Sequence, residues 1–184
     1  MAIKTFTTGE VLTAADTNTY LANSGLVTVG GGTFTNVASF DMTGFSSTYE
    51  LYDYRMVLKT AGSTTGVRAR IHLGATQRAT GYYGSSFFSK YTNTSGLTGI
   101  AANADHFYLG DVTGAPSNLI NGTITYTSSA QSFNITVQYM DNANAISVVG
   151  AFSNYDNHTW DRIRIYGNTS NLTGSYQLMG VRKS

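Results

Sequence analysis

The sequence predicts an all-β fold: an antiparallel β-sandwich of the jelly-roll kind, preceded by a short N-terminal arm that contains one short helix. Three observations support this prediction. The 184 residues suit one domain with a sizeable core. After Leu26, apolar and polar residues alternate with period two, as in strands buried on one face only. Clusters of Gly, Ser, Asn and Asp separate the alternating segments, as expected for turns.

The arm is predicted to cover residues 1–25 and the sandwich residues 26–184. Thr13 fits a helix N-cap and Asp16 the first turn, so a short helix is expected over 14–22. A helix of this length is marginal in water and needs a docking surface. That surface is either the arm's own domain or a neighbouring molecule.

The strands follow from the alternation along the chain. A tyrosine-rich segment, for example, places Tyr52, Tyr54 and Met56 on one face. The strong segments are 52–58, 67–73, 123–127, 133–139, 162–166 and 175–178, and weaker ones cover 33–40, 82–91, 107–109 and 146–152. Turns are expected at 62–66, 128–130, 141–144 and 168–171, the first as a hairpin between two strong strands. Roughly eight to ten strands are therefore expected, in keeping with a sandwich.

The composition excludes several classes of protein. Charged residues make up 11% of the chain and the net charge is +1, which argues against a nucleic-acid binder that neutralises phosphates. No apolar run is long enough for a membrane helix, and no signal peptide is expected. The absence of cysteine excludes disulfides and thiolate metal sites. A surface rich in Thr, Ser and Asn packs easily against a copy of itself, so a homotrimer or larger assembly is expected.

No catalytic, cofactor-binding or metal-binding residue is predicted. The phosphate-binding glycine loop, the zinc-binding HExxH motif and the GxSxG nucleophile elbow are absent from the sequence. Asp141 starts a segment like a calcium loop, but Ile146 and Phe152 stand where glycine and glutamate are needed. His106 and His158 lie near aspartates and are interpreted as ordinary surface histidines. His72 is expected on a polar strand face, satisfied by solvent or a neighbour.

Two features are candidate partner-binding surfaces. The residues concerned are Arg68, Arg70, Arg162, Arg164, Tyr82 and Tyr83. The arginines form two basic rows, each on the polar face of one strand, and each row is either a solvated face or a contact for an acidic partner. The tyrosines lie between glycines, where they pack in the core and rim or stack on a sugar or partner.

The N-terminal segment resembles a known family. Residues 6–21 read FTTGEVLTAADTNTYL. Many virion structural proteins of tailed bacteriophages start with a similar pattern: F, two or three residues, G, then VLTA-x-D-x-N and a short helix. The rest of the chain resembles a domain common in phage and environmental viral genomes. The matching segments are Leu26–Val29, Phe45–Tyr49, Tyr52–Arg55, Gly81–Gly84, Ile163–Gly167, Leu172–Gly174 and Gly180–Arg182.

This resemblance implies an attachment arm and an exchangeable outer domain. The implied attachment residues are Phe6, Val11, Leu12, Asp16, Asn18, Tyr20 and Leu21. The implied function is that of a non-enzymatic protein on the virion exterior, made in the host cytoplasm: a tail-associated, fibre-like or receptor-binding appendage. Its expected partners are copies of itself, the tail or major capsid protein, and a host surface glycan. Because no long shaft separates the arm from the sandwich, a capsid decoration (cement) protein remains an alternative. A glycan-degrading enzyme is a more remote one.

Overall fold

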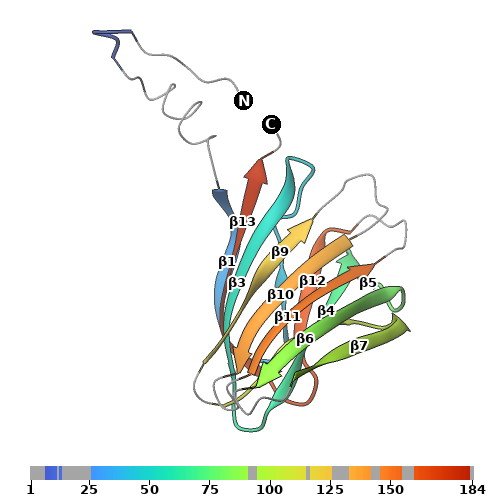
Figure 1. Cartoon of the computed structure of the whole chain (residues 1–184). Coiled ribbons are helices and arrows are strands. Elements are labelled where there is room, and N and C mark those ends of the chain that lie inside the picture. The colour runs from blue at the N-terminus through green and yellow to red at the C-terminus, as the bar shows by residue number, and fades with distance from the viewer. Residues whose placement is uncertain are drawn as a thin grey trace.

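The structure is a computed structural model that describes residues 7–11, 13, 26–90, 95–114, 117–125, 133–141, 146–154 and 160–182. The described residues form strands and no helix (Figure 1). The strands are β1 (Leu26–Val37), β2 (Ser39–Met42), β3 (Tyr49–Thr60), β4 (Thr65–Leu73), β5 (Thr76–Gln77), β6 (Tyr82–Lys90), β7 (Ser95–Ala104), β8 (Phe107–Val112), β9 (Asn118–Thr125), β10 (Phe133–Asp141), β11 (Ile146–Asn154), β12 (Arg162–Gly167) and β13 (Leu172–Arg182). The helix expected over 14–22 lies outside the described residues.

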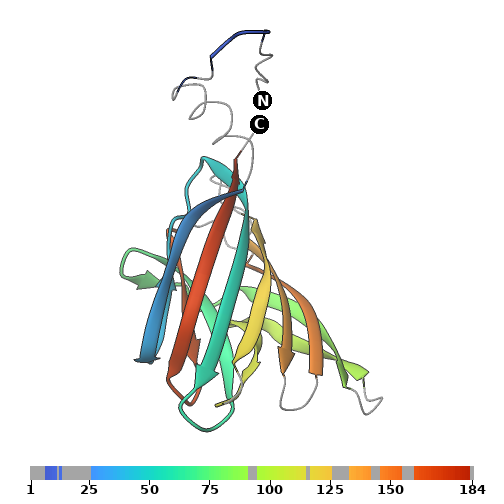
Figure 2. The same cartoon turned by 90° about the vertical axis from the view of Figure 1, so that its left-hand side faces the viewer.

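The strands form two antiparallel sheets, one over the other (Figures 1 and 2). The larger sheet has eight strands in the order β1-β13-β3-β9-β10-β11-β6-β7. The smaller has five: β2-β12-β4-β5, with β8 paired to β4. The chain passes repeatedly between the sheets, as in a jelly roll, and its first strand lies beside its last. The predicted antiparallel β-sandwich is therefore confirmed.

The core lies between the two inner faces. From β3 it receives Tyr52, Tyr54, Met56 and Leu58, all essentially inaccessible to solvent. Opposite them lie residues from the smaller sheet: Val67, Ala69, Ile71, Ile163 and Ile165. These are the positions that the alternation assigned to the core. Leu73 was placed on the same apolar face but is half-exposed, because β4 ends there in the turn to β5.

Three expectations about the strands were wrong. The turn after β3 is no hairpin, because β3 belongs to the larger sheet and β4 to the smaller. The segment predicted as one strand over 33–40 is divided between β1 and β2, since the chain changes sheets at Ala38. The described residues contain thirteen strands rather than roughly eight to ten, because β5 and the Gly- and Ala-rich β7 carry no clear alternation.

The first and last strands meet at one end of the sandwich. Leu26 at the start of β1 pairs with Val181 near the end of β13. Figures 1 and 2 both show β1 beginning where β13 ends. The arm therefore joins the sandwich beside the C-terminal strand, and the opposite end carries the turns after β3 and β12.

Candidate partner-binding surfaces

The four arginines predicted as two separate rows form one patch. Strand β12 pairs with β4, which places Arg164 opposite Arg70 and Arg162 opposite His72. Since the alternate residues of both strands fill the core, these side chains project from the outer face of the smaller sheet. We call Arg68, Arg70, Arg162 and Arg164 the basic patch.

Asp41 on β2 binds two of these arginines. The Nε and Nη2 atoms of Arg164 donate to its two carboxylate oxygens at 2.7 and 2.9 Å. Arg162 adds a bond from Nη1 at 3.2 Å. The hydrogen bond from Arg164 holds the pKa of Asp41 below its usual value, against the opposing effect of burial. A fork-to-fork pair of this kind fixes the guanidinium in one orientation.

Asp105, in the turn before β8, binds a third arginine. The Arg70 guanidinium donates to the Asp105 carboxylate and, from Nε, to the Asp105 carbonyl oxygen at 2.7 Å. His106 Nδ1 lies 2.5 Å from the other carboxylate oxygen, and this bond lowers the pKa of Asp105. The Arg70 guanidinium also lies 5.1 Å from the centre of the Tyr166 ring, within reach of a cation–π interaction.

These ion pairs change the chemistry expected of the patch. In the described part of the chain, Arg68 has no carboxylate partner, and its buried Nε makes no hydrogen bond. The other three arginines are held by Asp41 and Asp105, which sequence reasoning missed, and Arg162 also forms a 3.8 Å ion pair with Asp161. Both aspartates lie in segments without a charge pattern, so only the strand pairing reveals them. The patch is a polar surface in which two carboxylates partly balance four arginines, rather than a bare cationic one.

His72 differs from its prediction. It lies on the outer face of β4 as expected, but it is only 3% exposed. Neither ring nitrogen has a hydrogen-bond partner among the described residues. Burial lowers the pKa of His72, as do Arg164 and Arg162, so the ring is neutral near pH 7. The side chain borders a pocket of about 200 Å³ that Leu73, Gln77 and Trp160 also line.

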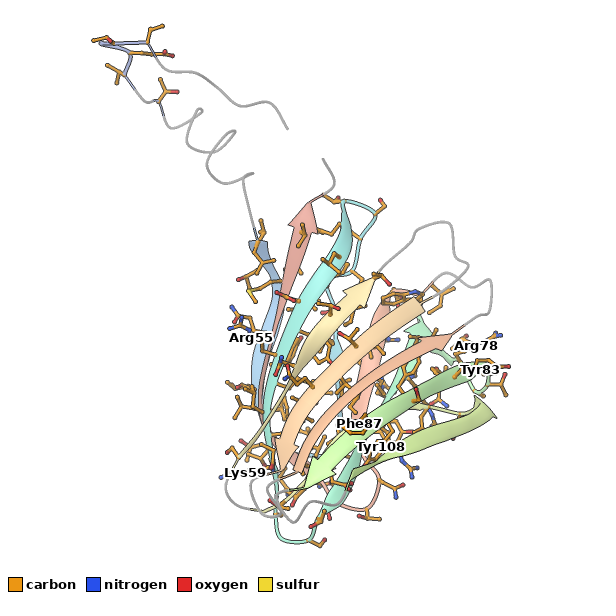
Figure 3. The ribbon with its side chains drawn as sticks, viewed as in Figure 1. Arg55, Lys59, Arg78, Tyr83, Phe87 and Tyr108 are labelled. Carbon is orange, nitrogen blue, oxygen red and sulfur yellow. The ribbon has the colours of Figure 1, made fainter. Side chains whose placement is uncertain are left out.

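The two tyrosines of the predicted binding loop have different environments. Tyr82 is fully buried, which agrees with the core-packing alternative and leaves it unavailable to a partner. Its hydroxyl accepts a hydrogen bond from the Ile71 amide at 3.0 Å and donates to the Arg78 carbonyl at 3.1 Å. These bonds tie β6 of the larger sheet to β4 of the smaller. Tyr83 is partly exposed, and Phe87 on the same strand is exposed (Figure 3).

The arm is described over residues 7–11 and 13. Residues 7–10 form a turn in which the Glu10 amide donates to the Thr7 carbonyl at 3.0 Å. All six of these residues are exposed, and Val11 is 78% exposed. The other predicted attachment residues lie outside the described part of the chain: Phe6, Leu12, Asp16, Asn18, Tyr20 and Leu21.

The predicted absence of a metal site and of a membrane helix concerns the whole chain, whereas the structure describes part of it. Within that part, no three His, Asp or Glu side chains gather as a metal site would require. The described residues likewise contain no helix long and apolar enough to span a bilayer. His158 lies outside them.

Comparisons with known proteins give structural similarities alone. No family model and no curated protein matches the chain. Among solved structures, peanut lectin with a 9mer peptide shares 11% identity over 87% of both chains, with a TM-score of 0.31. A protein of unknown function from Shewanella oneidensis MR-1 shares 10% over 86% of this chain and 80% of its own, with a TM-score of 0.28. The infectious bursal disease virus Gx strain matches 86% of this chain and 40% of its own at 11% identity, with a TM-score of 0.12. Similarities this weak carry no conclusion about function.

Proposed function

We propose that this chain is a non-enzymatic structural protein on the exterior of a tailed-phage virion. Residues 1–25 attach it to the particle, and the β-sandwich is displayed as a tail-associated, receptor-binding appendage. The proposal starts from the resemblance of residues 6–21 to the N-terminal segment of phage virion proteins. The structural observation that supports it best is the exposure of the described arm residues, 7–11 and 13.

The described arm residues do not bury themselves on the sandwich. Residues 7–11 and 13 are exposed, whereas the core is filled by residues from Met42 to Leu178. An apolar side chain such as Val11 loses about 1.5–3 kcal/mol of stabilisation when it is left in water rather than buried. A neighbouring molecule that covers the arm recovers this free energy, as expected of an attachment segment.

The position of the arm also suits display. It enters β1 at Leu26, beside the end of β13. Attachment at this end leaves the opposite end and both outer sheet faces accessible. One of these faces carries the basic patch, in which Asp41 and Asp105 already hold Arg70, Arg162 and Arg164. Polar groups ordered in advance lose less conformational entropy on binding a partner or a copy of the chain.

A capsid decoration protein is the second candidate. The observation that favours it is the start of β1 at Leu26, directly after the arm, with no shaft to hold the sandwich away from a shell. The glycan-degrading alternative gains nothing from Asp41 and Asp105. Both carboxyl groups are bound by arginine and have lowered pKa values, whereas a general acid needs a raised one.

The location in the particle tests this proposal. Antibody labelling of intact virions, combined with the number of copies per particle, separates the two candidates. The proposal predicts few copies and labelling confined to the tail. Many copies distributed over the head establish the decoration function instead. Absence of the protein from purified particles contradicts both.

A further inference from the structure

The outer face of the larger sheet contains a polar hollow of about 370 Å³ between β3, β9 and β10. Its outward side chains are Asp53, Arg55, Asn121, Thr123, Thr136 and Gln138. Each alternates with a core residue of its own strand, so all six project away from the core. Figure 3 labels Arg55 and, further along β3, Lys59.

The hollow is formed by an interruption in the pairing of β9 with β10. Pairing runs through Ile124 with Ile135 and resumes at Asn121 with Gln138, and no pair joins these two described strands in between. There the Thr123 amide donates instead to the Thr136 hydroxyl at 2.8 Å. From the core, the Tyr54 hydroxyl donates to the Thr136 carbonyl at 2.7 Å. The hollow is thus fixed by specific bonds.

The polar groups around the hollow have unused hydrogen-bonding capacity. The side chains of Asp53, Arg55, Asn121 and Gln138 make no hydrogen bond or ion pair with any described residue. The carboxylate accepts, the guanidinium donates, and the two amides do both. The charges of Asp53 and Arg55 cancel, so the hollow favours neither an anion nor a cation.

Apolar side chains border the hollow on one side. Val57 follows Arg55 by two residues on β3, and Leu119 precedes Asn121 by two residues on β9. They are direct cross-strand neighbours and are 43% and 49% exposed. The surface therefore combines donors and acceptors of zero net charge with an adjoining apolar pair.

We infer that this hollow binds a neutral pyranose sugar. The hydroxyl groups of a sugar ring both donate and accept, which matches the carboxylate, guanidinium and amide groups. Its C–H face is apolar and fits against Val57 and Leu119. The Asp53 carboxylate repels an anionic sugar, and the Arg55 guanidinium repels a cation. Sugar binding itself is inferred from the hollow. Only its biological role, contact of a displayed appendage with a host surface glycan, rests on the proposed function.

The test uses the purified full-length protein, labelled with ¹⁵N and titrated with glucose, galactose, mannose or N-acetylglucosamine. At least one sugar is expected to shift the side-chain amide signals of Asn121 and Gln138 in a saturable way. Asp53→Asn and Asn121→Ala are expected to weaken binding about ten-fold or more, because the first replaces the charged acceptor with a neutral amide and the second removes a polar partner of the sugar. The control, Lys59→Ala, changes an exposed residue of β3 outside the hollow and should bind like wild type.

The inference is overturned if none of the four sugars shifts these signals, or if an acidic sugar such as sialic acid binds more tightly. It is equally overturned if both variants bind like wild type. Should either variant have a lowered melting temperature, the wild-type titration and Gln138→Ala decide. Sugar binding by a protein that is absent from virions contradicts the proposed location alone, and a virion protein without sugar binding contradicts this inference alone.

Discussion

Asp41 organises the outer face of the smaller sheet. It accepts hydrogen bonds from Arg162 and Arg164, and its own carbonyl accepts one from the Tyr176 hydroxyl at 3.3 Å. Exposed ion pairs contribute little to stability, but a bidentate, partly buried pair lies at the upper end of the range. The carboxylate is 24% exposed, so its contribution should be measurable.

We expect Asp41→Asn to lower the free energy of unfolding by about 1 kcal/mol at pH 7. Arg164→Ala should cost a similar amount. Arg162→Ala loses one longer hydrogen bond to Asp41 and an exposed 3.8 Å ion pair to Asp161, and should cost about 0.5 kcal/mol or less. Urea unfolding of each variant measures these differences, with Lys59→Ala as an exposed control. Equal costs for the two arginines would contradict the assignment of the bidentate pair to Arg164.

The stabilisation by Asp41 should depend on pH. The pKa of Asp41 in the folded protein is lowered from 3.8. At pH values between the folded-state pKa and 3.8, the unfolded state therefore binds the proton more readily than the folded state. The contribution is therefore complete above about pH 4 to 5 and is lost as the pH falls through the lower, folded-state pKa. The difference between wild type and Asp41→Asn should shrink at about pH 3, and a difference that stays constant would contradict the pairing.

Sequence reasoning at the residue scale identified the arginines and missed their partners. The period-two pattern of β4 and β12 assigns Arg70 and Arg164 to polar faces correctly. Nothing in the sequence shows that these faces are adjacent, because pairing joins segments more than ninety residues apart. The same limit applies to Tyr82, whose burial depends on Ile71 and Phe107.

At the scale of elements, the contact of β9 with β10 has the tightest steric requirement near the hollow. A Cβ atom on Gly122 would lie 2.0 Å from the Thr136 carbonyl oxygen and 3.0 Å from the Tyr54 hydroxyl. The carbonyl belongs to the backbone and cannot rotate away. The close approach therefore requires glycine at this position.

Gly122→Ala should destabilise the protein by about 1–3 kcal/mol, because the strands must move apart to accommodate the methyl group. The matched control is Gly62→Ala in the turn after β3, where an added Cβ meets nothing within 4 Å. That variant should lie within about 0.5 kcal/mol of wild type. Thermal unfolding compares the two, and similar melting temperatures would contradict the close packing of β9 against β10.

The strands that sequence reasoning predicted best are those with a strict alternation. In β3 the pattern is complete, and all four predicted core residues are buried. In contrast, β7 has the sequence SGLTGIAANA, in which Gly and Ala obscure the period. The turn after β3 contains good hairpin residues, yet the next strand joins the other sheet. That choice is made by tertiary packing, which local turn chemistry does not encode.

On the scale of the whole molecule, the two ends of the sandwich differ. At the end opposite β1's start, hydrogen bonds join the turns. The Ser63 and Ser170 hydroxyls lie 2.9 Å apart, and the Thr169 amide donates to the Thr65 hydroxyl at 2.9 Å. The Thr60 amide also donates to the Thr113 carbonyl at 3.1 Å. The other end receives the arm. This difference suits a domain that is attached at one end and whose turns are joined by hydrogen bonds at the other.

The fold class followed from the sequence, whereas the hollow on the larger sheet did not. In the sequence, Asp53 and Arg55 lie on the polar face of one predicted strand and Gln138 on that of another, whereas Asn121 precedes the strand predicted over 123–127. Their proximity depends on the order β3-β9-β10 and on a local interruption of pairing. Neither can be predicted from the alternation of apolar and polar residues, because that pattern describes each strand separately.

Deletion of residues 1–25 tests the central claim, that the arm attaches a sandwich which folds independently. The described arm residues are exposed, so the free energy of unfolding of the truncated protein should lie within about 0.5 kcal/mol of that of the full-length chain. Both proteins are then mixed with virions that lack the native protein, and the bound amounts are compared. We predict that full-length protein binds and the truncated, folded sandwich does not. A sandwich that loses several kcal/mol of stability, or one that still binds the particles normally, would contradict the account.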